Sequence, residues 1–190
     1  MTVIAAAITK KDGVVIVGDS ELSGDFTKDT DGYSKIWVSD TQGYIFGACG
    51  SLRVMQVIKH WTNWPYFRPD VTDLEEFLVK EAVPNVREAL FEHGALEVNK
   101  KTESFEGDVI MAWDNNLVVI EGDFSVLIPV SGRYAIGSGL SEAMGRLGNT
   151  GPYTKEDVID AARRATITAL GVGGPLWVTT TKTMKVEQVQ

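Results

Sequence analysis

The sequence contains little cysteine and histidine, and both shortages exclude classes of protein. Cys49 is the only cysteine among 190 residues, so the chain holds no internal disulfide, which fits a reducing compartment such as the cytoplasm. The two histidines, His60 and His93, are not spaced as metal ligands, and no cysteine lies at ligand spacing from either. We therefore expect no metal site and no bound cofactor.

The chain also has fewer basic than acidic residues. Lysine and arginine number 18 against 26 acidic residues, which gives a formal net charge of −8. A general nucleic-acid binder needs a basic face, and so does a protein that binds an anionic membrane. No apolar run approaches the roughly 20 residues that span a bilayer. The composition predicts a cytoplasmic protein with no nucleic-acid partner and no membrane partner.

What the sequence does contain is a generous supply of core residues. Hydrophobic residues make up 44% of the chain, and no linker or low-complexity segment divides it, so we expect one domain over residues 1–190. Alternating β-branched runs and turn signals predict strands in three groups. The ranges are 3–8, 14–18, 34–38 and 44–49, then 108–113, 117–121, 124–129 and 133–137, and finally 176–181 and 184–189.

Helical periodicity appears between these groups of strands. One helix follows Ser51, and a second begins with the capping-box pattern that starts at Thr72; two more are expected over residues 141–148 and 154–171. The polar stretch 19–33 is predicted to be a long loop. The order ββββ-αα-ββββ-αα-ββ predicts an α+β fold. We expect a four-layer αββα sandwich, in which helix pairs flank two antiparallel sheets.

Two further patterns carry little functional information. The glycine-rich segment 171–174 has no following Lys-Ser/Thr, so a helix stop and a turn explain it better than a phosphate loop. Four aromatic residues lie close together and suit either the edge of a core or a subunit contact. They are Trp61, Trp64, Tyr66 and Phe67.

The residue after the initiator methionine carries groups that can act as a nucleophile and its base. Removal of Met1 would leave Thr2 with a hydroxyl and a free α-amine on one residue. An α-amine has a reference pKa of about 7.7–8.0, so it is a suitable base for activating its own hydroxyl as a nucleophile. Any chain can begin Met-Thr, so this feature has meaning only in the context of other motifs.

Those other motifs are present, in a fixed order along the chain. They are Gly13–Asp19 (GVVIVGD), Ser34–Ile36 (SKI), Gly47–Ser51 (GACGS) and Tyr134–Gly139 (YAIGSG). Together with Thr2 they resemble the proteasome β-subunit and bacterial HslV family of N-terminal nucleophile hydrolases, and the likeness is closest to HslV. The resemblance covers nearly the whole chain and includes the order of strands and helices.

The resemblance implies a role for five residues. Thr2 matches the nucleophile, and Lys35 matches the lysine that lowers the pKa of the Thr2 hydroxyl and amine. Asp19 matches the acid that keeps this lysine charged and aimed. Gly50 matches the residue whose backbone N–H stabilises the oxyanion. Ser138 matches a serine that hydrogen-bonds near the amine of the nucleophile, although it also suits a helix N-cap.

The implied function is a threonine peptidase that cleaves protein or peptide substrates. Family members work as closed rings, so the resemblance implies a homo-oligomer and a possible ATP-dependent unfoldase partner. One departure leaves alternatives open: the late Asp-x-x-Ser of the family is replaced here by Leu170 and Gly173. A catalytically silent scaffold or binding protein, and an amidase that acts on a small substrate, remain alternative readings.

Overall fold

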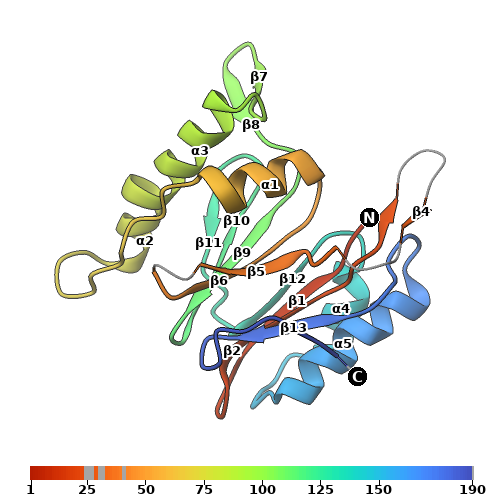
Figure 1. The fold of residues 1–190 in the computed structure, drawn as a ribbon. Helices are drawn as coiled ribbons and strands as arrows, with labels where there is room; N and C mark the ends of the chain where they lie inside the picture. The colour runs from red at the N-terminus through yellow and green to blue at the C-terminus, as the bar shows by residue number, and fades with distance from the viewer. Residues whose placement is uncertain (24–27, 30–32, 40–41, 190) are drawn as a thin grey trace.

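The strands form two five-stranded antiparallel sheets in the computed structural model, which describes residues 1–23, 28–29, 33–39 and 42–189 (Figure 1). The first sheet has the order β12-β1-β2-β13-β14. Its strands are β1 (Ile4–Thr9), β2 (Gly13–Gly18), β12 (Arg133–Ile136), β13 (Trp177–Thr180) and β14 (Glu187–Gln188). The Asp12-Gly13 turn joins β1 to β2, as a hairpin signal of this type predicts.

The second sheet has the order β11-β10-β9-β6-β5. Its strands are β5 (Ile36–Ser39), β6 (Tyr44–Ala48), β9 (Val109–Trp113), β10 (Asn116–Ile120) and β11 (Val126–Leu127). The sequence predicts each of these strands, but β11 covers only two residues of the predicted range 124–129. Phe124 has a positive φ of 67°, and the Glu121 N–H donates to the Ser125 carbonyl at 2.9 Å, so a turn occupies the start of that range.

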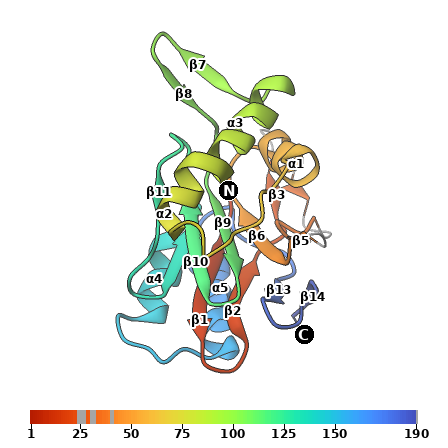
Figure 2. The ribbon, with the colours of Figure 1, turned by 90° about the vertical axis from the view of Figure 1, so that its left-hand side faces the viewer.

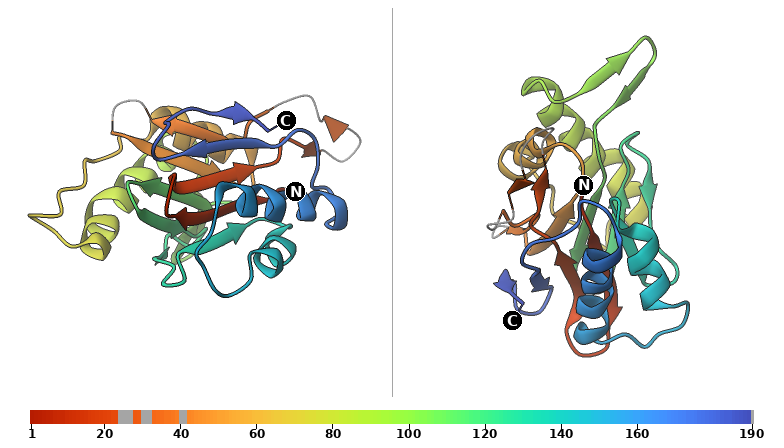
Figure 3. Two further views of the ribbon diagram at one scale, coloured as in Figure 1. Left: turned by 90° about the horizontal axis from the view of Figure 1, so that it is seen from below. Right: turned by 90° about the vertical axis from the view of Figure 1, so that its right-hand side faces the viewer.

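The helices form two groups on opposite sides of the strands (Figures 1 and 3). One group contains α1 (Leu52–Trp61), α2 (Leu74–Phe77) and α3 (Val83–Glu92), with a π-helical turn over Leu78–Ala82 between the last two. The other contains α4 (Leu140–Leu147) and α5 (Lys155–Thr168). Thr154 caps α5 in a capping box with Asp157, which accounts for the sharp start of that helix.

Three clusters of buried side chains hold these elements together. Strand β1 contributes to two of them, because its successive side chains point to opposite faces of the sheet. Ile4 and Ala6 face the second sheet, whereas Ala5 and Ala7 face α4 and α5. The third cluster packs α1 and α3 against the other face of the second sheet. Both faces of β1 are therefore dry, which explains its unbroken apolar sequence.

The predicted α+β class with antiparallel sheets is confirmed, and the structure corrects three local predictions. The predicted loop 19–33 contains a short hairpin of β3 (Leu22–Ser23) and β4 (Lys28–Asp29). The charged stretch after α3 contains the projecting hairpin of β7 (Glu97–Asn99) and β8 (Thr102–Ser104), seen in Figure 2. Neither hairpin has the apolar alternation that signals a strand.

The third correction concerns the start of α2. Asp73, rather than Thr72, is the N-cap, and its carboxylate accepts a hydrogen bond from the Glu76 N–H at 2.8 Å. The Thr72 hydroxyl instead lies 3.4 Å from the Glu76 carboxylate. Both residues suit the cap position, and an ionised carboxylate makes the stronger bond to a backbone N–H.

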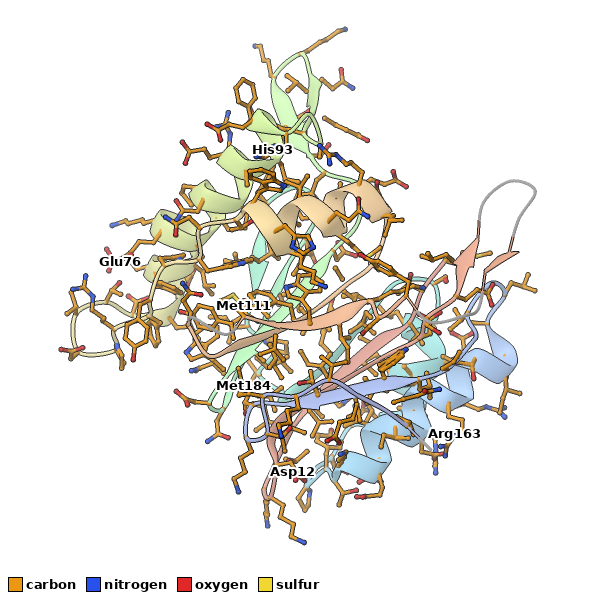
Figure 4. The ribbon with its side chains drawn as sticks, viewed as in Figure 1. Asp12, Glu76, His93, Met111, Arg163 and Met184 are labelled. Atoms are coloured by element: carbon orange, nitrogen blue, oxygen red, sulfur yellow. The ribbon has the colours of Figure 1, made fainter. Side chains whose placement is uncertain are left out.

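The aromatic cluster divides between the core and the surface. Trp64 is buried and Phe67 packs against Phe77 and Trp113. Trp61 is exposed, and its ring lies 4.0 Å from the ring of His93 at the end of α3, the residue marked in Figure 4. Thus part of the cluster is the predicted core edge. None of the helices in the described ranges is both long and apolar enough to cross a membrane.

Phe77, in the cluster that packs α1 and α3 against the second sheet, provides a test of stability. Phe77→Ala removes a fully buried ring that contacts Phe67 and Trp113, so we expect the free energy of unfolding to fall by about 3–5 kcal/mol. Val79→Ala, an exposed neighbour in the same segment, serves as the matched control and should change it by less than about 0.5 kcal/mol. Urea unfolding followed by tryptophan fluorescence measures both.

Candidate active site

The candidate residues converge on one end of the first sheet. Thr2 precedes β1, Asp19 follows β2, and the register pairs Ile4 with Gly18 across the hairpin. Ile4 also pairs with Ile136 of β12, which brings Ser138 to the same end. The β1–β2 turn, marked by Asp12 in Figure 4, lies at the other end of these two strands. Antiparallel pairing therefore places residues from distant parts of the sequence side by side.

Lys35 is the centre of the site. It lies just before β5, and its side chain is only 1% exposed. The ammonium donates hydrogen bonds to the Thr2 Oγ1 at 2.9 Å and to both carboxylate oxygens of Asp19 at 3.0 and 3.1 Å. It also reaches the Met1 carbonyl oxygen at 2.9 Å. A buried ammonium that is paired in this way holds the hydroxyl of Thr2 in one position.

Asp19 is fixed by the backbone on both sides. Its Oδ1 accepts the N–H of Val3 at 3.0 Å, and its Oδ2 accepts the N–H groups of Glu21 and Gly173, each at 3.3 Å. Asp19 in turn donates its own N–H to the Val3 carbonyl at 3.2 Å. These bonds orient the carboxylate toward Lys35 and leave it no other rotamer to adopt at similar cost.

The backbone of Thr2 is held by the segment after β12. The Thr2 nitrogen donates to the Ser138 Oγ at 3.1 Å, and this hydroxyl lies 3.3 Å from the Thr2 carbonyl oxygen. Gly137 has φ +86°, and a Cβ there would collide with that carbonyl, so the close approach needs glycine. The predicted helix-cap role of Ser138 is wrong, because Gly139 is the N-cap of α4.

Gly50 lies at the end of β6, next to this network. Its φ is +95°, and a Cβ would collide with the Glu106 carbonyl, so the position requires glycine. Its neighbours are anchored: the Cys49 N–H bonds to Asp108 and the Ser51 N–H to Glu106, each at 3.0 Å. The hydrogen bonds described for Thr2, Asp19, Lys35 and Ser138 link these four residues. Gly50 follows β6, whose last residue, Ala48, donates its N–H to the Lys35 carbonyl at 3.1 Å.

Burial sets the ionisation of the central pair. Burial lowers the pKa of Lys35 from its ordinary value, and the nearby Asp19 carboxylate limits that decrease. A lysine with a lowered pKa releases its proton more readily than one in water. The group that donates a hydrogen bond to the Thr2 Oγ1 is therefore a more acidic ammonium than that of an exposed lysine.

The single thiol is a poor rival as a nucleophile. Burial and the adjacent Asp108 carboxylate raise the pKa of Cys49 to about 12. Its Sγ lies 3.7 Å from the Asp108 Oδ2. Since the thiolate is the reactive form, Cys49 is essentially unreactive at neutral pH.

One buried acid near these residues was not singled out from the sequence. Glu21 is 2% exposed and lies beside Gly173, one of the two residues that stand where the resemblance predicts Asp-x-x-Ser. It lies in the polar stretch 19–33, for which the sequence predicts a long loop. The register of β1 and β2 places Asp19 at the same end of the sheet as Thr2. The surroundings of Glu21 depend on the segment 171–174, which is far away in sequence. Among the described residues, no three His, Cys, Asp or Glu side chains form a group that could hold a metal ion.

Comparison with models of protein families and with curated protein sequences gives no match. Solved structures do match: HslV from Trypanosoma brucei has a TM-score of 0.62 at 19% identity, over 93% of this chain and 97% of that chain. Thiobacillus denitrificans BPH in complex with epoxomicin has 0.70 at 18%, over 99% of both. This chain has their fold.

A third match extends the comparison to an assembly. The Anbu complex from Pseudomonas aeruginosa, solved as a helical assembly, has a TM-score of 0.69 at 14% identity over 99% of this chain and 86% of that chain. At these identities the similarity concerns the fold. The expected likeness to HslV is therefore confirmed at the level of the fold.

The buried ion pair predicts a non-additive effect on stability. Asp19→Ala leaves the Lys35 ammonium buried without its carboxylate, so we expect a loss of about 3–5 kcal/mol in the free energy of unfolding. The double variant Asp19→Ala/Lys35→Met removes both charges and should lose less than the single variant. Chemical denaturation of the wild type, the two single variants Asp19→Ala and Lys35→Met, and the double variant measures the coupling, and strictly additive losses would contradict the ion-pair interpretation.

The thiol gives a chemical test. We expect iodoacetamide at pH 7.5 to leave Cys49 unmodified in the folded protein, because the group is buried and its pKa is about 12. The same protein in denaturant should be alkylated within minutes. Intact mass measures both reactions, and rapid alkylation of the folded protein would show that Cys49 is accessible.

Proposed function

We propose that this protein is a threonine peptidase in which Thr2 is the nucleophile once the Met1–Thr2 bond has been cleaved. The observation that carries this proposal is the 2.9 Å hydrogen bond from the buried Lys35 ammonium to the Thr2 Oγ1. Threonine needs activation to attack a carbonyl, and a positive charge next to its oxygen stabilises the alkoxide that develops. Asp19 is the positioning residue that aims Lys35.

The proposed reaction has two steps. Met1 is present in the structure, so the Thr2 nitrogen is an amide; cleavage of the bond to Met1 turns it into an α-amine beside Ser138. The Oγ1 then attacks the substrate carbonyl carbon while the amine accepts the hydroxyl proton. The peptide C–N bond breaks as that proton passes to the leaving amine, which leaves an ester on Thr2.

Hydrolysis completes the cycle. The α-amine removes a proton from water, the hydroxide attacks the ester carbonyl, and the carboxylic acid product leaves as Oγ1 regains its proton. In both steps the backbone N–H of Gly50 is proposed to donate to the oxyanion. Loss of one such donor typically raises the barrier by about 2.7–4 kcal/mol.

The neighbouring structures support the class of reaction and the assembly. BPH was solved in complex with epoxomicin, and Anbu was solved as a helical assembly. For this chain we propose one domain with the four-layer αββα arrangement of N-terminal nucleophile hydrolases. A cytoplasmic homo-oligomer, arranged as a ring, acts on peptide or protein substrates, with an ATP-dependent unfoldase as the proposed partner.

A second candidate has one observation in its favour. The residues that stand in place of the late Asp-x-x-Ser are Leu170, which is 86% exposed, and Gly173, so two polar side chains are missing. A silent scaffold or binding protein would tolerate this loss, and so would an amidase for a small substrate. The intact Thr2–Lys35–Asp19 network favours the enzyme, because a scaffold has no need of a buried ammonium aimed at a hydroxyl.

Epoxomicin and intact mass test the nucleophile directly. We expect the wild-type protein to be lighter by one methionine and to gain one epoxomicin adduct on Thr2. Thr2→Ala should lose the adduct and reduce peptide hydrolysis to background, whereas Thr2→Ser, which keeps the hydroxyl and the amine, should retain both at a lower rate.

The controls separate the alternatives. Unchanged turnover in Thr2→Ala would exclude Thr2 as the nucleophile. A full-length mass without any adduct would favour the scaffold. An adduct combined with turnover of small amides only would favour the amidase.

A further inference from the structure

A cavity lies at the end of the second sheet away from the candidate active site. Strand β5 begins after Lys35 and β6 ends two residues before Gly50, so the turn between these strands lies at the opposite end of their hairpin. The cavity has a volume of about 420 Å³, within the range of small-ligand sites, and Tyr44 and Trp113 line it. Because β6 spans five residues, about 17 Å of strand separates the cavity from Gly50.

Four aromatic residues line this cavity. Tyr44 and Trp113 are buried, and their ring centroids lie 5.2 Å apart at an interplanar angle of 70°. Phe67, from the segment after α1, lies 5.6 Å from Trp113 at an angle of 67°. Its neighbour Tyr66 is 69% exposed. The buried rings therefore form the floor of the cavity, and Tyr66 forms part of its rim.

The Tyr44 hydroxyl holds the aromatic segment against the sheet. It accepts the N–H of Phe67 at 3.0 Å and donates to the Pro65 carbonyl at 2.8 Å. The Phe67 ring also packs against Phe77 of α2, with 5.0 Å between the centroids. The aromatic walls are therefore in place before a ligand arrives, which reduces the entropy cost of binding.

Asp114 gives the cavity a negative charge. It follows β9 and lines the cavity together with Asn116, whose side-chain amide offers an oxygen acceptor. Among the described residues that line the cavity, none is lysine or arginine. Burial raises the pKa of the Tyr44 hydroxyl, and the Asp114 and Glu81 carboxylates raise it further. These surroundings favour a cation as the ligand.

We propose that this cavity binds a guanidinium group, carried either by an arginine side chain of a peptide or by a small guanidine. A guanidinium is planar and weakly hydrated, so it stacks on aromatic rings, and its N–H groups match a carboxylate in two parallel hydrogen bonds. Tyr66, Phe67 and Trp113 supply the rings, and Asp114 supplies the carboxylate. An ammonium has the charge but neither the plane nor the paired donors.

This site goes beyond the proposed function. It takes residues from the ends of β6 and β9 and from the segment after α1, whereas Thr2, Asp19 and Lys35 lie at the other end of β5 and β6. Binding of the guanidinium requires neither the nucleophile nor removal of Met1. The site and the peptidase can therefore be tested independently.

Three blocked peptides test whether the cavity recognises the charge. They are acetyl-Gly-Arg-Gly-amide and the same peptide with lysine or with citrulline, which keeps the shape of arginine but is neutral. We expect the arginine peptide to bind with a dissociation constant of about 1 mM or below. The lysine peptide should bind about threefold more weakly and the citrulline peptide about tenfold more weakly. Saturation-transfer NMR on the peptide signals measures all three with the full-length protein.

Ethylguanidinium, which has no peptide bond to cleave, separates the two sources of the group. If it binds as tightly as the arginine peptide, the ligand is a small guanidine, because the peptide backbone adds no affinity. If the peptide binds more tightly by about fivefold or more, the ligand is an arginine of a peptide or protein. Either result supports the guanidinium site.

Two variants locate the binding in this cavity. Asp114→Asn removes the charge and should weaken binding of the arginine peptide about tenfold. Asp114 has a φ of 47°, which asparagine also adopts readily, so the turn is retained. Tyr66→Ala should weaken binding about threefold, whereas Tyr66→Phe keeps the ring and should bind as the wild type does. Glu92→Gln removes an exposed carboxylate at the end of α3 and should leave binding unchanged.

The peptide series is decisive even if a variant fails to fold. Equal binding of the arginine and citrulline peptides would overturn the inference, and so would the absence of saturation transfer at about 10 mM of every probe. A lysine peptide that binds as tightly as the arginine peptide would contradict the choice of a guanidinium. Unchanged binding in both folded Asp114→Asn and folded Tyr66→Ala would place the ligand elsewhere on the molecule, which also contradicts the inference.

Discussion

The structure depends on the burial of one ammonium group. Lys35 is held between the two sheets, and it needs acceptors from several chain segments because an unpaired charge in the interior costs several kcal/mol. Asp19 comes from the end of β2, and the Thr2 Oγ1 and Met1 carbonyl come from the start of the chain. Folding that satisfies Lys35 therefore assembles the candidate site at the same time, and loss of any acceptor weakens both.

The backbone around this group is adapted to close approach. Gly50 and Gly137 adopt positive φ and leave no room for a Cβ, so the segments after β6 and β12 run directly beside Glu106 and Thr2. At Gly173 the neighbour is a side chain rather than the backbone, since a Cβ there would lie 2.5 Å from the Glu21 Oε2. The site is built from strand ends, which antiparallel register holds rigidly, and this suits a reaction that requires fixed positions.

Sequence reasoning succeeded where local patterns determine structure. The β1–β2 hairpin follows from two β-branched runs and Asp12-Gly13, and Thr154 begins α5 as its capping pattern predicts. It failed where tertiary contacts hold a weak segment in place. The β7–β8 hairpin is polar apart from Val98, and its Glu103 is bound by Arg87 on α3, so no apolar periodicity identifies it as strand. Thr72 and Asp73 compete for one cap position, and only the geometry decides between them.

The sequence by itself determined the class of fold, because strand patterning is a local property, and the resemblance of its short motifs to a known family named the candidates Thr2, Asp19, Lys35, Gly50 and Ser138. Only the tertiary structure joined Thr2, Asp19, Lys35 and Ser138 through hydrogen bonds. It alone also placed Glu21 against Gly173. These two residues are about 150 positions apart, and their proximity depends on how β13 returns to pair with β2. Such a contact has no periodic or compositional signature, since it arises from the packing of segments that share no local pattern.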